Sequence, residues 1–212
     1  MEKRGSRGLL VVVEGVDGAG KSSVLRHLAD CCKGLRDGLV LSREPTDGPH
    51  GRRLRESAVT GRLALETELE LFLNDRRQHV EGLIEPALER GALVLLDRYY
   101  FSTAAYQGAR GADPDAVLLA NEAFAPEPDL VLLLDCAPVV TLERIRLRGG
   151  GADAFERIES LEAVRRIFLG IQRPFIRVVD AAREPGEVAR ECVELLEELL
   201  VAKGGFSLKS DR

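Results

Sequence analysis

Apolar and polar positions follow two alternating patterns along the chain. Short, mainly apolar segments that predict buried strands occupy residues 9–14, 39–42, 93–96, 130–134 and 175–179, and the first begins with an unbroken apolar run from Leu9 to Val13. The segments between them place apolar residues at helical spacing, which predicts helices over 21–33, 51–59, 66 to about 89, 114–123, 139–148, 160–172 and 187–201. Residues 99–108 include small and polar residues beside aromatic ones and are assigned to no element. Pro86 predicts a kink or an end in the longest helix.

Short buried strands joined by helices are typical of a parallel sheet that is covered on both faces. The pattern therefore predicts an α/β fold with a five-stranded parallel sheet flanked by helices. The 212 residues fit one domain. We expect this domain to span 9–203, between an N-terminal tail at 1–8 and a C-terminal tail at 204–212. Ligands of such folds bind at the carboxyl ends of the strands.

A glycine-rich loop follows the first expected strand. From Gly15 to Ser22 the chain reads G-V-D-G-A-G-K-S, which matches G-x-x-x-x-G-K-[ST] between a strand and a helix. Glycines let backbone N–H groups turn inward, and the following helix adds its positive N-terminal end. We expect Lys21 to reach the outer phosphates of a nucleotide and the Ser22 hydroxyl to help hold Mg²⁺. A glycine turn with a solvated lysine is the alternative, and the strand–loop–helix context disfavours it.

The formal net charge of −5 argues against a bulk affinity for nucleic acid or anionic membranes. The sequence contains no apolar run approaching the roughly 20 residues that a membrane-spanning helix needs. Residues 1–8 are not followed by a signal-peptide pattern. We therefore expect a cytoplasmic protein without a nucleic-acid or membrane partner, and any attraction for phosphate must be local.

Charged residues follow several of the expected strands. Arg43, Asp97, Arg98 and Asp135 come directly after strands, so one crevice could contain most of them. Phosphoryl transfer needs cations around two sets of phosphates, and the planar guanidinium group suits phosphate oxygens. We expect Arg43 and Arg98 to act in this way, with solvated surface arginines as the alternative. Asp97 could bind Mg²⁺ through water, whereas a structural cap is about as plausible for Asp135.

Three further arginines, Arg144, Arg146 and Arg148, end one expected helix. They cannot share one helix face, because positions two residues apart point in different directions. Arg148 stands next to three glycines at 149–151, where a mobile lid would begin, and this place favours a functional role for it.

Two aromatic residues, Phe72 and Tyr106, are notable in an aromatic-poor chain. Phe72 shares a helical face with Leu69 and Leu73, so spacing alone favours ordinary core packing. Stacking against a nucleotide base is the sharper alternative.

A phosphate-binding loop alone fits a small-molecule kinase, a GTPase or a motor-type ATPase. A GTPase should carry a guanine-reading N-K-x-D motif after an apolar strand, and this sequence has none. An ATPase module of a larger machine usually needs more chain. The residues therefore favour a small kinase with two phosphate-bearing ligands.

Four sequence blocks resemble the thymidylate kinase family, and the resemblance extends from about residue 9 to residue 193. The blocks are E-G-V-D-G-A-G-K-S at 14–22, R-E-P at 43–45, L-F-L-N-D-R with Q-H at 71–79, and D-R-Y with S-T-A-A-Y-Q-G at 97–108. The resemblance implies a P-loop NTPase-type three-layer sandwich with a short lid at about 148–158. It also implies transfer of the γ-phosphoryl group of ATP to dTMP, dependence on Mg²⁺, and a homodimer.

The resemblance assigns an acceptor site for dTMP residue by residue. Asp17 matches the carboxylate that contacts the sugar 3′-hydroxyl, and Arg43 and Arg98 match the arginines around the acceptor phosphate. Phe72 matches the ring that stacks on thymine, and Arg76 matches the residue that reads the edge of the base. The remaining acceptor residues are Ser102, Thr103 and Gln107 on the polar side of the pocket, and Tyr106, which matches the residue that disfavours a 2′-hydroxyl.

The resemblance also assigns a donor site for ATP. Its residues are Gly15, Asp17, Gly18, Ala19, Gly20, Lys21, Ser22, Ser23 and Arg144, of which Arg144 matches the arginine that packs on adenine. Some family members carry a basic residue inside the phosphate loop, but position 18 is glycine here, which shifts the required charge to the lid and to Arg148. We expect Lys21, Arg98, Arg148 and Asp17 to be catalytic, and Ser22 and Asp97 to hold the metal.

The chain departs from the family pattern after the R-E-P block, at Ser23 of the phosphate loop, and in a glycine-rich lid that carries Asp153 and Glu156. The usual R-E-P-G-G-T is R-E-P-T-D-G here, and Asp47 adds a negative charge close to a phosphate-binding stretch. A kinase for another nucleoside monophosphate therefore stays an alternative. So does a regulatory module that binds nucleotides with little turnover.

Overall fold

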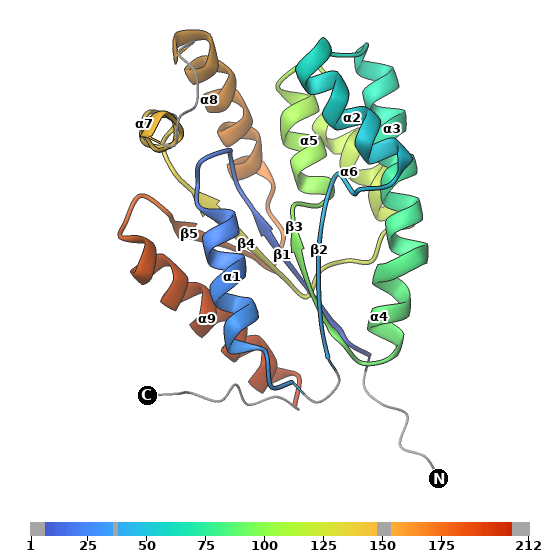
Figure 1. Cartoon of the computed structure of the whole chain (residues 1–212), viewed down its shortest axis with the longest axis vertical. Helices are drawn as coiled ribbons and strands as arrows, with labels where there is room; N and C mark the ends of the chain where they lie inside the picture. Colours follow the sequence, from blue (N-terminus) through green and yellow to red (C-terminus); the bar gives the residue numbers. More distant parts are fainter. Residues whose placement is uncertain (1–6, 36–37, 148–153, 205–212) are drawn as a thin grey trace.

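A computed structural model describes residues 7–35, 38–147 and 154–204 of the chain (Figure 1). Its strands form one parallel sheet in the order β2-β3-β1-β4-β5. The strands are β1 (Leu9–Glu14), β2 (Leu39–Arg43), β3 (Leu93–Asp97), β4 (Leu130–Asp135) and β5 (Ile176–Asp180). Each lies within one residue of its expected position, so the predicted five-stranded parallel sheet is confirmed.

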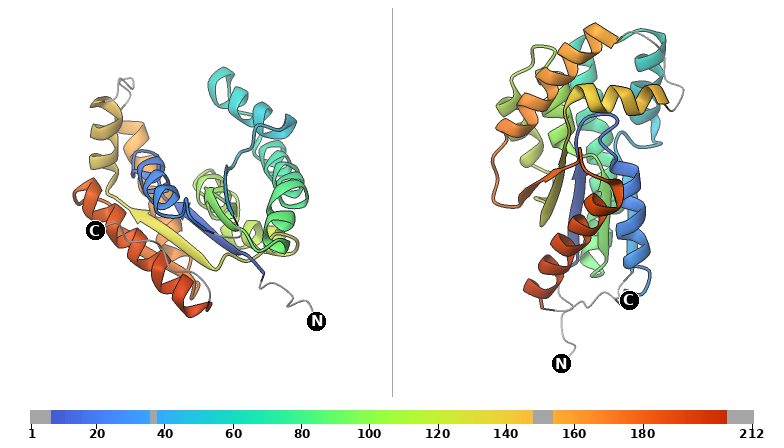
Figure 2. Two further views of the ribbon diagram at one scale, coloured as in Figure 1. Left: turned by 60° about the horizontal axis from the view of Figure 1, so that its bottom comes forward. Right: turned by 90° about the vertical axis from the view of Figure 1, so that its left-hand side faces the viewer.

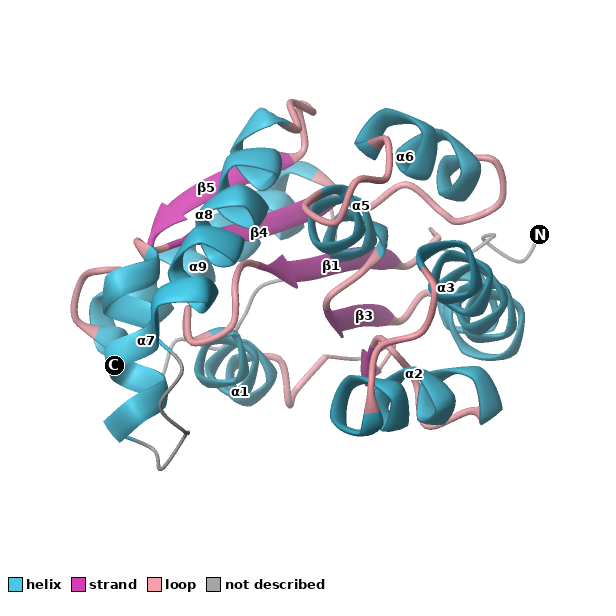
Figure 3. Ribbon diagram, turned by 90° about the horizontal axis from the view of Figure 1, so that it is seen from above, coloured by secondary structure: helices cyan, strands magenta, loops and turns pink. Residues whose placement is uncertain are grey.

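Helices lie on both sides of the sheet. The helices are α1 (Lys21–Cys31), α2 (Pro49–Thr60), α3 (Leu65–His79), α4 (Glu85–Glu89), α5 (Tyr100–Gly108), α6 (Pro114–Glu122), α7 (Pro138–Leu147), α8 (Ala154–Gly170) and α9 (Pro185–Ala202). Seen from above, α1 and α9 lie on one side of the sheet, and α5, α6 and α8 lie on the other (Figure 3). This arrangement has the three layers that the α/β pattern predicts. None of the helices among the described residues is both long and apolar enough to cross a membrane.

The longest expected helix is present but changes its winding. A π-helical segment, Val80–Ile84, joins α3 to α4, and Pro86 lies in the first turn of α4. Proline lacks a backbone N–H and its ring crowds the carbonyl group four residues earlier, so a locally wider turn relieves the clash.

Two helices differ from the prediction. The segment left unassigned forms α5, in which Tyr100 to Ala105 and Gln107 are all buried. Because α5 is enclosed on nearly every side, its sequence has no polar stripe and shows no helical period. Helix α8 begins at Ala154, six residues before the expected start at residue 160. Of the expected lid at 148–158, residues 148–153 lie outside the described residues.

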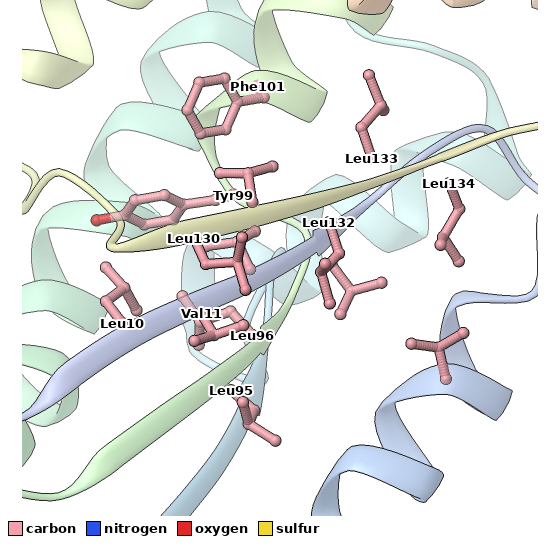
Figure 4. Packing of buried hydrophobic residues seen from close by; sticks show 14 of the residues in the cluster. Leu10, Val11, Leu95, Leu96, Tyr99, Phe101, Leu130, Leu132, Leu133 and Leu134 are labelled. Atoms are coloured by element: carbon pink, nitrogen blue, oxygen red, sulfur yellow. The ribbon is translucent and has the colours of Figure 1, made fainter. Parts of the chain in front are cut away.

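The core surrounds the central strand. Every residue of β1 is buried, and Leu10 and Val11 pack with Leu96 of β3 and Leu132 of β4 (Figure 4). Tyr99, directly beyond β3, joins the same cluster. The chain leaves β1 into α1 on one side of the sheet, whereas it leaves β3 through α5 on the other (Figure 3). Such a switch between neighbouring strands opens a crevice at their carboxyl ends.

Candidate active site

The phosphate-binding loop occupies this crevice, and its glycines are required by its shape. Gly15 and Gly18 have φ values of 138° and 86°, a backbone conformation that other residues rarely adopt. A Cβ atom on Gly15 would lie 2.5 Å from the Leu134 carbonyl oxygen, and one on Gly18 would lie 2.6 Å from the Thr141 carbonyl oxygen. Helix α1 begins after Gly20 without a side-chain cap. Its first N–H groups are therefore available to an anion.

The side chain of Lys21 is hydrogen-bonded to the backbone of the same loop. Its side chain is buried, and its Nζ donates to the carbonyl oxygens of Gly15 and Val16, both at 2.9 Å. Burial and the positive charge of Arg98 lower the pKa of Lys21 to about 8. The ammonium group is thus hydrogen-bonded to the backbone of the loop that would bind an oligophosphate.

A small cavity of about 230 Å³ lies over this loop. It is lined by Asp17, Gly18, Gly20, Lys21, Ser22, Ser23, Asp97 and Arg98. Asp97 Oδ1 is buried and has no hydrogen-bond partner among the described residues. The described residues form no cluster of three or more His, Cys, Asp or Glu side chains that could hold a metal alone. Ser22 and Asp97 therefore fit a hard cation such as Mg²⁺ whose other ligands are phosphate and water oxygens.

A second cavity continues beyond the loop. It is lined by Gly18, Ala19, Gly20, Ser23, Arg144, Ala181, Arg183, Pro185 and Val188. Arg144 donates through Nη1 to the Ala181 carbonyl oxygen at 2.8 Å, which holds its guanidinium plane at the wall of the cavity. Arg183, which the sequence analysis did not single out, pairs with Glu191 and donates to the Asp180 carbonyl oxygen.

The third cavity, of about 240 Å³, lies on the other side of the loop. Eight of the nine expected acceptor residues line it, namely Asp17, Phe72, Arg76, Arg98, Ser102, Thr103, Tyr106 and Gln107. Phe72 is half-buried and is not part of the buried core, so the geometry does not support the core interpretation that spacing favoured. The lining also includes Glu44, Arg55 and Glu68, to which the sequence analysis gave no role.

Arg98 lies where this cavity meets the loop. Its φ of 69° is unusual for a residue other than glycine, and backbone strain of this kind gathers at functional sites. Its guanidinium group donates to Asp17 Oδ1 at 2.6 Å and to Ser102 Oγ at 3.0 Å. The same group lies over the Tyr106 ring, 5.2 Å from the centroid.

A buried glutamate, Glu14, holds Ser102, which is one of the two hydrogen-bond partners of Arg98 described above. Its carboxylate accepts from the backbone N–H groups of Tyr99 and Ser102 and from the Ser102 hydroxyl, at 2.8, 3.1 and 2.6 Å. Burial raises the pKa of Glu14, although the charge of Arg98 opposes that rise. Glu14 thus ties the end of β1 to the start of α5.

Arg76 lies in the far wall of the third cavity and is almost fully enclosed. Its Nε donates to Glu44 Oε2 at 2.8 Å, its Nη2 donates to Thr103 Oγ1 at 3.1 Å, and its Nη1 donates to Asn121 Oδ1. Glu44 Oε1 lies 3.0 Å from His79 Nδ1. Because each partner comes from a different element, the guanidinium plane is held in one orientation.

Comparison with known proteins decides the family. A family model described as thymidylate kinase matches residues 13–192. A thymidylate kinase from Xanthomonas campestris pv. campestris (strain B100) is 51% identical over 184 residues, which cover 87% of this chain and 81% of that protein. A thymidylate kinase from Xylella fastidiosa (strain M23) is 50% identical over 198 residues, which cover 93% of this chain and 91% of that protein. The chain belongs to the thymidylate kinase family. The predicted P-loop NTPase-type fold is thereby confirmed.

One expected acceptor residue of this thymidylate kinase family member does not line the third cavity. Arg43 is exposed, and its Nη2 donates to Asp47 Oδ1 at 2.9 Å. The same oxygen accepts from Arg55 Nη2 at 2.8 Å, and Arg55 also donates to the Pro45 carbonyl oxygen at 2.7 Å. The family departure at Asp47 therefore holds two arginines together, and Arg55 rather than Arg43 faces the cavity. The sequence signal that could have identified Arg55 was its position on the first helix after the R-E-P block.

The remaining candidates lie elsewhere. Asp135 forms a two-pronged ion pair with Arg165 of α8, at 2.6 and 2.7 Å, which fits the structural role and not a metal site. Arg148 lies outside the described residues. Helix α7, which ends at Leu147, and helix α8, which begins at Ala154, lie on the opposite side of the molecule from α2 and α3 (Figures 1 and 2).

Proposed function

We propose that this protein transfers the γ-phosphoryl group of ATP to dTMP, giving ADP and dTDP. The observation that carries the proposal is that Asp17 and Arg98 line both the phosphate-loop cavity and the third cavity. Two phosphate-bearing ligands that occupy these cavities would therefore meet at one arginine. Membership of the thymidylate kinase family supports the choice of ATP and dTMP as those ligands.

The proposed transfer relies on positioning and charge neutralisation. Lys21 and the loop N–H groups bind the donor phosphates, and Arg98 holds the acceptor phosphate in line with them. Ser22 and Asp97 would hold Mg²⁺, which supplies further neutralisation of phosphate charge when bound. The acceptor phosphate is already a nucleophile at neutral pH, so no general base is needed. By resemblance, we propose that Arg43 assists at the acceptor phosphate and that Arg148 closes over the transferring group.

The third cavity would hold the nucleoside of dTMP. Phe72 would supply an aromatic face for thymine, and the remaining N–H group of Arg76 would supply a donor for a carbonyl oxygen of the base. The Tyr106 hydroxyl accepts from the Asp17 backbone N–H at 3.1 Å, which holds the ring at the cavity wall. By resemblance, we propose that this ring lies under the sugar and disfavours a 2′-hydroxyl. On the other side of the loop, Arg144 would pack on adenine. We also propose a cytoplasmic homodimer, as the resemblance implies.

The first experiment is ADP release by the purified protein with Mg²⁺-ATP and a panel of dTMP, dUMP, UMP, dCMP, dGMP and AMP. We expect dTMP to give the fastest release and UMP a much slower one, because UMP carries a 2′-hydroxyl. If another nucleotide gives the fastest release, the kinase activity is retained, and that nucleotide replaces dTMP as the proposed acceptor. Binding of ATP and dTMP without ADP release would favour the regulatory module instead.

A pH dependence follows from Lys21. Its pKa of about 8 in the free protein means that the lysine is protonated below this pH and neutral above it. We expect kcat/KM for Mg²⁺-ATP to fall about tenfold per pH unit above pH 8. The value of kcat should hold to higher pH, because bound phosphates favour the charged lysine. Steady-state kinetics from about pH 6.5 to about pH 9.5 test this, and a flat kcat/KM profile would contradict it.

A further inference from the structure

Gln107 has a half-satisfied side chain in the wall of the third cavity. Only 2% of the residue is exposed. Its Nε2 donates to Glu68 Oε2 at 3.0 Å, whereas its Oε1 is buried without a hydrogen-bond partner among the described residues. Buried acceptors are nearly always paired in folded proteins. This unpaired oxygen therefore indicates a donor that a ligand supplies.

Glu68 determines which end of the carboxamide remains unpaired. It is 3% exposed and accepts from Arg110 Nη1, while Arg62 Nη1 lies 3.4 Å away. A carboxylate that pairs with guanidinium groups can only accept hydrogen bonds. It therefore binds the NH₂ group of Gln107 and excludes the opposite orientation, in which two oxygens would face each other. The carboxamide oxygen of Gln107, a residue that lines the cavity, is left without a hydrogen-bond partner among the described residues.

We propose that Glu68 is a positioning residue that makes the acceptor site selective for pyrimidines with a hydrogen on N3. The inference rests on the proposed function, because it concerns the base of the acceptor nucleotide. Thymine and uracil carry an N3–H donor, which the Gln107 oxygen accepts. Cytosine has an unprotonated N3, which would face that oxygen as a second acceptor. Arg76 can only donate, so the two residues together match a base with carbonyl oxygens and one N–H.

The substitution Glu68→Gln tests the inference. It keeps the shape of the side chain but supplies an NH₂ group, so the Gln107 carboxamide can turn and offer its own NH₂ to the cavity. We expect the ratio of dTMP to dCMP affinity, measured by calorimetry without ATP, to fall about tenfold. Weaker dTMP binding and stronger dCMP binding should both contribute, and KM for ATP should change little.

The control variant is Arg110→Gln. Arg110 pairs with Glu68 and also donates to the Leu63 carbonyl oxygen, but it does not line the cavity. Its loss removes an ion pair and leaves the bond between Glu68 and Gln107, so the base preference should persist even where the melting temperature falls. An equal loss of preference in both variants would overturn the inference, since it would follow from general loosening of this region.

Two further outcomes are decisive. A Glu68→Gln protein that melts earlier but keeps the wild-type preference for dTMP would show a purely structural role for Glu68. Where that variant does not fold, Gln107→Met removes the oxygen and should lower the preference by weakening dTMP binding alone; an unchanged preference overturns the inference. If the wild-type protein binds neither dTMP nor dUMP, the proposed function fails first, and this outcome is distinguishable from the others.

Discussion

Replacing Lys21 with methionine lowers kcat by about 10³-fold, the loss expected when one preorganised cation or donor is removed from a charged transition state. Methionine keeps most of the aliphatic stem of the buried side chain, so the loop should stay folded. Only the ammonium group is lost. Its two partners, the carbonyl oxygens of Gly15 and Val16, belong to the loop itself. No other lysine lines the phosphate-loop cavity among the described residues.

The measurement separates chemistry from acceptor binding. Single-turnover rates with saturating ATP should fall by the full factor, whereas the affinity for dTMP should stay within about threefold, because Lys21 does not line the acceptor cavity. Lys33→Met is the matched control, since Lys33 is an exposed lysine that pairs only with Asp30 among the described residues. Turnover of the Lys21 variant within about tenfold of the wild type would remove this lysine from the proposed mechanism.

The predictable parts of this molecule are those in which the cause is local. An apolar run such as Leu93–Asp97 can be interpreted as a buried strand from its own residues, and the loop from Gly15 to Lys21 is defined by its spacing. Helix α5 was missed because its environment is buried on almost every side, which erases the period that identifies a surface helix. The positive φ of Arg98 has no counterpart in the sequence, because arginine ordinarily avoids that conformation.

For three buried carboxylates, the identity of the partners also could not be predicted from the sequence alone. Glu44 and Glu68 would each be expected at the surface, where most glutamates lie, and the partners of Glu14 at the end of its expected strand could not be foreseen. Their partners are distant along the chain: Ser102 is 88 positions from Glu14, and Gln107 is 39 positions from Glu68. Only the fold brings them together, so their roles in orienting the site residues emerge from tertiary contacts. The resemblance supplied the residues that we propose to contact the ligands, but not the buried carboxylates that orient those residues.

The largest effect on stability is expected for Glu44→Ala. Glu44 is buried, and its carboxylate pairs with Arg76, of which 1% is exposed, and contacts His79. Removing one partner of a buried ion pair leaves an uncompensated charge and typically costs about 3–5 kcal/mol. In a protein of this size that loss lowers the melting temperature by about 10 °C. Urea unfolding and thermal melting both measure it.

The control for this variant is Glu198→Ala, because Glu198 is an exposed glutamate on α9 with no ion pair among the described residues. Its change in unfolding free energy should stay within about 0.5 kcal/mol. A Glu44 variant that loses less than about 1 kcal/mol would show that Asn121 and Thr103 suffice for the buried guanidinium. The same carboxylate also orients Arg76 toward the third cavity, so KM for dTMP should rise while KM for ATP does not. Loss of stability without that rise would separate the folding role of the ion pair from recognition of the base.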